Sequence, residues 1–182
     1  MALCGITQGF NFDCNSLKRV SGVKRVWAGN LDDLRTGIDP NGTGYVTGLA
    51  FDGYDGLYEF ESKKFSHQVV HNLVVGEGGA VSWAQVATLR LFVDTPEEVE
   101  ALSDLAVSNV ILVVETNNGE FRIYGANNGM TAVDPTTGTT GRLQGEDTTD
   151  SITLNGNEKL PYRILLKTDY ATTLALVEAL EF

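Results

Sequence analysis

The chain has 182 residues, with 13 basic against 24 acidic side chains and a formal net charge of -11. This length suits one domain with a sizeable core, and the negative charge repels phosphate backbones, which excludes tight nucleic-acid binding. The sequence has neither an apolar run of about 18 residues for a membrane span nor the basic and apolar regions of a signal peptide. We therefore expect synthesis in the cytoplasm and no membrane partner.

Residues 1–22 mix glycine, asparagine and serine with isolated apolar positions. This pattern predicts an extended N-terminal arm, followed by a single domain over residues 23–182. Cys4 and Cys14 lie in the arm, and two cysteines are too few for a disulfide framework or a zinc site. Reduced thiols are favoured over a disulfide between them.

Alternating side chains predict a first strand over residues 23–29. Turn clusters at residues 39–42 and 52–56 enclose residues 45–51, and residues 57–60 follow. The first cluster lacks the later ligands of a calcium loop, so a turn is the better interpretation.

Residues 64–75 and 80–93 form two long strand patterns joined by the glycine-rich residues 76–79, which predicts a long β-hairpin. Gln85 interrupts the apolar face of the second strand. A strand of 14 residues exceeds the usual length in globular sheets. We therefore expect residues 81–93 to pair with a neighbouring chain.

Residues 95–98, Thr-Pro-Glu-Glu, combine a capping box with proline at the first helical position and predict the start of a helix. Val99, Leu102, Leu105 and Ala106 would give this helix one apolar stripe.

Residues 110–115 predict an apolar strand buried on both faces, and the Asn-Asn-Gly turn at residues 117–119 leads into a partner strand over residues 120–125. A second Asn-Asn-Gly turn follows at residues 127–129. Residues 135–141 are rich in threonine and glycine and predict a loop.

Residues 151–154 and 160–166 read as closing strands around a turn at Asn155 and Gly156. Helical spacing of apolar residues over positions 169–180 predicts a short C-terminal helix with Asp169 as its N-cap.

No motif in the chain indicates catalysis. His67 and His71 share a strand face about 13 Å apart, too far to hold one ion, so polar strand positions are favoured over a metal site completed by other residues. Neither a nucleophile elbow nor a phosphate-binding loop is present. We expect no catalytic residue, cofactor or metal, and we expect that the protein is not an enzyme.

The block from residue 95 to residue 130 resembles phage tail tube proteins. The shared order is a helix, an apolar strand, an Asn-Asn-Gly turn, an aromatic strand ending in glycine, and a second Asn-Gly. The threonine- and glycine-rich stretch and the strand ending near Glu158 continue this likeness. The opening is similar to virion proteins of phages that infect Bacteroidota, through Gly9-Phe10, Asp13-Cys14 and the segment at residues 21–26.

The resemblance implies a mainly β (α+β) fold, a β-sandwich or small barrel with a long hairpin, one flanking helix and a short C-terminal helix. It also implies a structural virion protein whose hexameric rings stack into a tube that conducts DNA without specific binding. The partners would be further copies and other tail proteins. The long hairpin would supply strands to a sheet lining the channel, and an acidic channel would repel DNA.

We expect subunit contacts at the hairpin and in the threonine- and glycine-rich stretch, with plain loops as the alternative. The candidate interface residues are Glu77, Gly78, Gly79, Val81, Trp83, Thr136, Thr137, Gly138, Thr139, Thr140 and Gly141.

Two other functions stay open at this point. One is a ring or adaptor protein of a short tail or a head-to-tail junction. The other is a monomeric carbohydrate-binding β-sandwich, in which Trp27, Tyr54, Tyr58 and Trp83 would contact the sugar.

Overall fold

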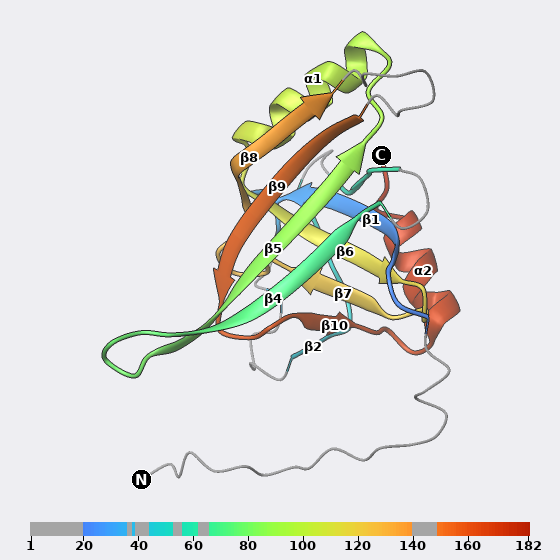
Figure 1. Cartoon of the computed structure of the whole chain (residues 1–182). Coiled ribbons are helices and arrows are strands. Elements are labelled where there is room, and N and C mark those ends of the chain that lie inside the picture. The colour runs from blue at the N-terminus through green and yellow to red at the C-terminus, as the bar shows by residue number, and fades with distance from the viewer. Residues whose placement is uncertain (1–19, 36–37, 39–43, 53–55, 62–65, 140–148) are drawn as a thin grey trace, which may run out of the picture.

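The computed structural model describes residues 20–35, 38, 44–52, 56–61, 66–139 and 149–182, and arranges them as two β-sheets packed face to face with two helices (Figure 1). In sheet order, the six-stranded sheet contains β2 (Tyr45–Val46), β10 (Arg163–Leu165), β7 (Phe121–Tyr124), β6 (Val110–Thr116), β1 (Val23–Asn30) and β3 (Tyr58–Glu59). The four-stranded sheet contains β4 (Gln68–Val75), β5 (Val81–Leu91), β9 (Thr149–Glu158) and β8 (Thr131–Thr139). The helices are α1 (Pro96–Val107) and α2 (Tyr170–Glu178). The mainly β, sandwich-like fold is confirmed.

Strand β6 lies inside the larger sheet, and its side chains alternate between two cores. Leu112 and Val114 pack between the sheets, whereas Ile111 and Val113 pack on the opposite face. A strand that is apolar on both faces must be covered on both. Helix α2 contributes Val177 to the second core, which completes a third layer of the molecule. The predicted burial of both faces of this strand is confirmed.

Two predicted hairpins are present. Gly119 has a φ of 77° in the turn between β6 and β7, a conformation that favours glycine. The β4–β5 hairpin pairs residue by residue from Gln68 opposite Thr88 to Val75 opposite Val81. Strand β5 has 11 residues, fewer than the 14 expected.

Both helix starts are confirmed. Thr95 caps α1 and forms a reciprocal capping box with Glu98. Asp169 caps α2 and accepts a 2.8 Å hydrogen bond from the backbone nitrogen of Thr172. These bonds satisfy backbone donors that the first helical turn leaves unpaired.

The apolar stripe predicted for α1 is wrong in part. Leu105 is buried and Leu102 packs against the core between the sheets. Val99 is 56% exposed and Ala106 is also exposed. The reason is that α1 lies along one margin of the sandwich near β8, so only a narrow line of its surface meets the core (Figure 1).

The predicted loop at residues 135–141 is wrong up to Thr139, because these residues belong to β8. Thr137 pairs with Ser151 and Thr139 with Thr149, after a register shift that begins at Val133. The shifted stretch contains Pro135, which has no N–H to donate to a ladder. Because β-branched threonines suit strands, pairing with β9 prevails over the loop composition.

The predicted turn at Asn155 and Gly156 is also wrong, since β9 runs through both residues to Glu158. A Cβ atom added to Gly156 would lie 2.5 Å from the carbonyl oxygen of Gly129 and 3.1 Å from Cγ of Met130. Gly156 therefore permits the close approach of another segment rather than a change of chain direction.

Several other expectations are met in shorter form or lie outside the described residues. The patterns at residues 45–51, 57–60 and 160–166 contain the short strands β2, β3 and β10. The arm up to residue 19, with Cys4 and Cys14, lies outside the described part of the chain, as does the whole turn cluster at residues 39–42.

Candidate assembly interface

The outer half of the β4–β5 hairpin projects beyond both sheets (Figure 1). Leu73 is 53% exposed, Val75 62% and Val81 57%, and Val70 and Val74 are exposed as well. Neighbouring residues of a strand point to opposite faces, so apolar side chains are exposed on both sides of the hairpin. The sequence predicted Val81 as an interface residue and the whole hairpin as a source of strands for the assembly, but it named no single residue of β4, although the unalternated apolar run at residues 73–75 was a visible signal.

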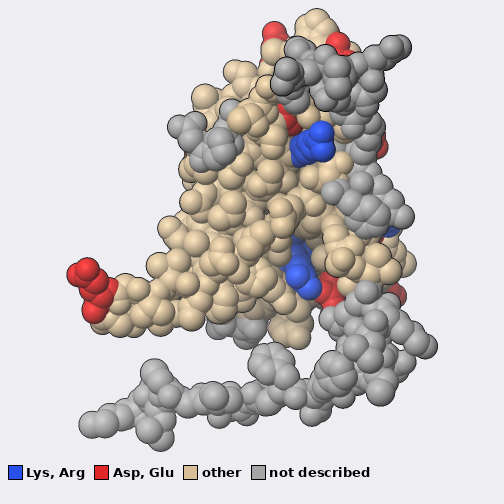
Figure 2. Space-filling view, in the orientation of Figure 1, with Lys and Arg blue, Asp and Glu red and all other residues tan. Residues whose placement is uncertain are grey.

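Charge is confined to the tip of this projection. Among acidic and basic residues, only Glu77 lies between Gln68 and Thr88. Figure 2 accordingly shows an uncharged finger that ends in an acidic tip. Glu77, Gly78 and Gly79, which the sequence predicts as contact residues, are all exposed there.

Strand β4 forms one end of the four-stranded sheet, so no strand among the described residues pairs with its outer edge. An exposed edge with apolar residues on both faces can pair with another chain. The prediction that residues 81–93 pair with a neighbour is wrong for most of β5. Over Trp83 to Thr88, β5 lies between β4 and β9 and is paired on both sides.

The root of the hairpin is anchored to the other sheet through Gln85, which is completely buried. Its Oε1 accepts a 2.7 Å hydrogen bond from the backbone nitrogen of Gly125, and its Nε2 donates to the carbonyl oxygens of Leu160 and Pro161 at 3.2 and 3.0 Å. The polar residue that interrupts the apolar pattern thus holds the two sheets together beneath the projecting half.

Trp83 is half-buried beside this anchor, and its ring meets His71 edge-on at 5.8 Å between centroids. His71 also contacts the ring of Tyr162 at 5.3 Å. Burial and the nearby Arg122 guanidinium lower the pKa of His71, so the neutral imidazole is favoured. Of the predicted interface residues, Trp83 therefore belongs to the support of the hairpin more than to its free surface.

His67 does not join His71. The backbone nitrogen of Arg90 donates to Nδ1 of His67 at 3.3 Å, and Nε2 donates to the carbonyl oxygen of Phe60 at 3.1 Å. Burial lowers the pKa of His67. Within the described ranges, no group of three histidine, cysteine or acidic side chains is placed to hold a metal ion.

The second predicted contact segment lies elsewhere on the same sheet. Thr137 and Gly138 are exposed on β8, and Thr136 and Thr139 belong to that strand. Thr140 and Gly141 lie outside the described residues.

The two predicted contact segments, the hairpin tip and the described part of residues 136–141, lie at diagonally opposite corners of the four-stranded sheet. Strands β4 and β8 are opposite ends of the sheet, and the pairs at Gly138–Asp150 and Asp150–Leu91 place the second segment at the far end of β5 from Val81. Ten residues of strand correspond to about 34 Å. One copy therefore does not bring the segments together, whereas a head-to-tail contact joins unlike surfaces of two copies.

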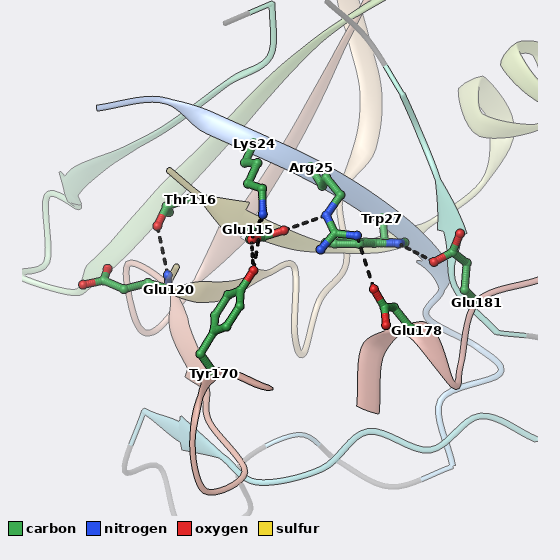
Figure 3. Close-up of polar contacts among 9 residues, drawn as sticks. All are labelled: Lys24, Arg25, Trp27, Glu115, Thr116, Glu120, Tyr170, Glu178 and Glu181. Carbon is green, nitrogen blue, oxygen red and sulfur yellow. Dashed lines mark hydrogen bonds and ion pairs between the residues drawn. The ribbon is translucent and has the colours of Figure 1, made fainter. Parts of the chain in front are cut away.

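A buried polar cluster, missed at the sequence level, connects the larger sheet with α2 (Figure 3). The Glu115 carboxylate is fully buried and accepts hydrogen bonds from Lys24 Nζ at 2.6 Å, Arg25 Nε at 2.7 Å and the Tyr170 hydroxyl at 2.7 Å. Arg25 also lies 3.6 Å from Glu178 of α2. In the sequence, the one signal of this polar cluster was Glu115, an acidic residue at the end of an apolar strand.

The pKa of Glu115 reflects two opposed effects. Burial raises the pKa of its carboxyl group, but the hydrogen bonds from Lys24, Tyr170 and Arg25 outweigh burial, and the net pKa is below its ordinary value. The glutamate is therefore a charged structural link between strand and helix.

The described members of the predicted sugar-binding surface, Trp27, Tyr58 and Trp83, do not lie together. Trp27 is completely buried and packs at 6.3 Å from Phe121, so it cannot contact a carbohydrate. Tyr58 and Trp83 belong to different sheets, and Tyr54 lies outside the described residues. The predicted sugar contact is therefore wrong for Trp27, and Tyr58 and Trp83 do not share one binding surface.

No protein-family model, curated protein or solved structure matches the chain. Among the described residues, no helix has both the length and the apolar character needed to cross a membrane.

Proposed function

We propose that the chain is a structural subunit of a phage tail, whose copies contact one another head to tail and form rings that stack into a tube. The observation that carries this proposal is the projecting hairpin, which has exposed apolar side chains on both faces and, at β4, an edge that no described strand pairs with. Such a surface is a hazard in a monomer and needs a cover. Head-to-tail contacts between identical subunits generate rings when the rotation closes.

In this arrangement the edge of β4 adds to a sheet of the next copy and extends it around the ring. The resemblance to tail tube proteins implies six copies and a place in the virion tail, with other tail proteins as further partners. DNA passes through without specific binding, because a subunit with a net charge of -11 repels phosphate groups.

The test compares two substitutions of equal chemistry at exposed valines. Val75 lies on the hairpin, whereas Val107 is 84% exposed on α1. Replacing either one with lysine removes little buried surface, so the unfolding free energy should change by no more than about 0.5 kcal/mol. We expect Val75→Lys to stay monomeric and Val107→Lys to assemble like the wild type.

Light scattering over a concentration series measures the mass of the species in solution. Negative-stain images of the same samples show whether these species are rings or tubes. Stacked tubes support a tail tube, and single rings support an adaptor at a short tail or head-to-tail junction. A wild-type chain that stays monomeric at every concentration, or a Val75→Lys variant that assembles like the wild type, contradicts the proposal.

A further inference from the structure

Residues 180–182 form an extended segment along the β3 end of the larger sheet. The backbone nitrogen of Leu57, directly before β3, donates to the carbonyl oxygen of Leu180 at 2.8 Å, and the backbone nitrogen of Phe182 donates to the carbonyl oxygen of Leu57 at 3.0 Å. Leu57 and Glu181 thus pair as in a parallel sheet. The segment therefore uses the donor and the acceptor that Leu57 would otherwise present to a strand of another molecule.

Side chains also hold this segment against the sheet. Leu180 packs against the core that α2 covers. The indole nitrogen of Trp27 donates to Oε2 of Glu181 at 3.3 Å (Figure 3). The ring of Phe182 lies 6.3 Å from that of Tyr58 between centroids. Residues 180–182 are therefore attached to β1 and β3, strands that lie far from them in the sequence.

Gly56 makes room for the segment. A Cβ atom added at position 56 would overlap the carbonyl oxygen of Leu180 and would lie 2.7 Å from Cδ2 of Phe182. A glycine next to a strand often marks such a close approach of another backbone. Any other residue at position 56 would push the segment away from the sheet.

One pair of charges opposes this attachment. The pKa of Glu59 is raised by burial and by the Glu181 carboxylate, with a further contribution from Glu61, and Arg25 only partly offsets these effects. The charged form of Glu59 is therefore disfavoured while Glu181 lies beside it, and release of the segment relieves the repulsion. The segment is thus bound in a way that permits detachment.

The other sheet ends differ in how they are protected. Strand β2, at the opposite end of the larger sheet, has two residues. Strand β4, at one end of the four-stranded sheet, has eight. Proteins protect sheet edges from other chains by covering them or by keeping them short. Among the described residues, the larger sheet shows both devices and β4 shows neither.

We propose that residues 180–182 act as a detachable covering strand, which closes the β3 end of the larger sheet and confines strand addition between copies to the four-stranded sheet. This inference rests on the proposed self-assembly and specifies which sheet takes part in it. Release of the segment makes the edge at Leu57 available, so that another copy can add a strand there.

Amide hydrogen exchange tests the attachment, because local opening exposes the amides that it covers. The amide of Leu57 reports on the segment, and that of Val113 on the interior strand β6 is the reference. We expect Gly56→Ala to speed exchange at Leu57 several-fold and to leave Val113 unchanged. Gly78→Ala is the matched control, since no atom lies within 4 Å of its added Cβ.

Glu59→Gln should act in the opposite direction, because it keeps the shape of the side chain and removes its charge. At neutral pH we expect exchange at Leu57 to slow several-fold. Glu100→Gln makes the same charge change on the exposed face of α1 and should leave exchange at Leu57 unaltered. A wild-type exchange rate at Leu57 in either Gly56→Ala or Glu59→Gln overturns the inference.

Light scattering tests the consequence for association, in a Val75→Lys background that removes the hairpin contact. Deleting residues 180–182 there should produce concentration-dependent oligomers, whereas Val75→Lys alone stays monomeric. In these oligomers the amide of Leu57 should regain protection, which aggregation of a misfolded chain would not restore. Circular dichroism checks the fold, and Gly56→Ala takes the place of the deletion if the shortened chain does not fold.

A folded chain without residues 180–182 that stays monomeric, or oligomers in which Leu57 remains unprotected, overturns the inference. The two proposals fail in different ways. A Val75→Lys chain that assembles like the wild type contradicts the proposed function, while exchange at Leu57 still tests the covering strand.

Discussion

The hydroxyl group of Tyr170 donates a 2.7 Å hydrogen bond to Oε1 of Glu115, and this bond joins the first residue of α2 to β6. Because the Glu115 carboxylate is fully buried, its charge depends on Tyr170, Lys24 and Arg25 for the hydrogen bonds that water would otherwise supply. The third layer of the fold is therefore attached to the sheet by a polar link as well as by apolar packing.

Replacing Tyr170 with phenylalanine removes one donor to Glu115 and keeps the ring, which lies 5.7 Å from Phe121. Oε1 of Glu115 keeps Lys24 as a donor, so we expect the free energy of unfolding to fall by about 1.5–3 kcal/mol, the contribution of one hydrogen bond to a charged group. Urea denaturation followed by fluorescence measures it. Tyr58→Phe, on an exposed ring, is the control, and equal stability of the two variants would contradict the assigned role of the hydroxyl group.

Glu115 also predicts a pH dependence. Its pKa is lowered in the folded state, so its contribution to stability is present above the ordinary value of 4.5 and is lost as the pH falls through the folded-state pKa. Between about pH 5 and pH 3, the unfolding free energy of the wild type should fall more steeply than that of Glu115→Gln. Parallel curves for the two proteins would show that the buried carboxylate does not titrate in this way.

Gln85 connects three backbone groups across the sandwich. In Gln85→Leu, the amide nitrogen of Gly125 and the carbonyl oxygens of Leu160 and Pro161 lose their partner. We expect a loss of about 1–3 kcal/mol of unfolding free energy for each group that stays buried and unpaired. The same substitution at Gln68, which is exposed on β4, should change stability by less than about 0.5 kcal/mol. Thermal unfolding compares the two, and a similar midpoint would refute the anchor.

Gly156→Ala tests the close approach inside β9. The added methyl group meets the carbonyl oxygen of Gly129 and forces a shift that should cost about 1–3 kcal/mol of stability, as overpacking does. Gly78→Ala is the matched control because no atom lies within 4 Å of its added Cβ. If both variants unfold at the same denaturant concentration, Gly156 has no packing role.

Gly79→Pro tests the hairpin tip. Gly79 has a φ of 77° and its backbone nitrogen donates to the carbonyl oxygen of Gly76, and proline allows neither. The tip lies outside both cores, so we expect native circular dichroism together with loss of assembled species in light scattering. Rings of normal appearance in this variant would count against the hairpin as the contact surface.

Local features of this protein were predictable because their causes lie within a few residues. The Thr95 and Asp169 caps are satisfied by groups three residues away, and the turn at Gly119 needs one left-handed residue. The existence of the β4–β5 hairpin followed from two strand patterns around a glycine-rich tip, although both strands are shorter than those patterns. The apolar strand β6 likewise predicted cover on both faces, since its pattern reports burial directly.

Other features depended on which segments meet. In the sequence, Gly156 has the composition of a turn, but its role is to allow the close approach of Gly129. Gln85 interrupts an apolar strand face, and its role is to accept a hydrogen bond from the backbone nitrogen of Gly125. The threonine- and glycine-rich residues around Gly138 form a strand because they pair with β9. By itself, the sequence determined the strands, caps and turns that short-range hydrogen bonds and side-chain periodicity specify. Only the tertiary structure decided that β4 is an edge, that β5 is interior and that Glu115 joins α2, because these depend on contacts between residues far apart in the chain.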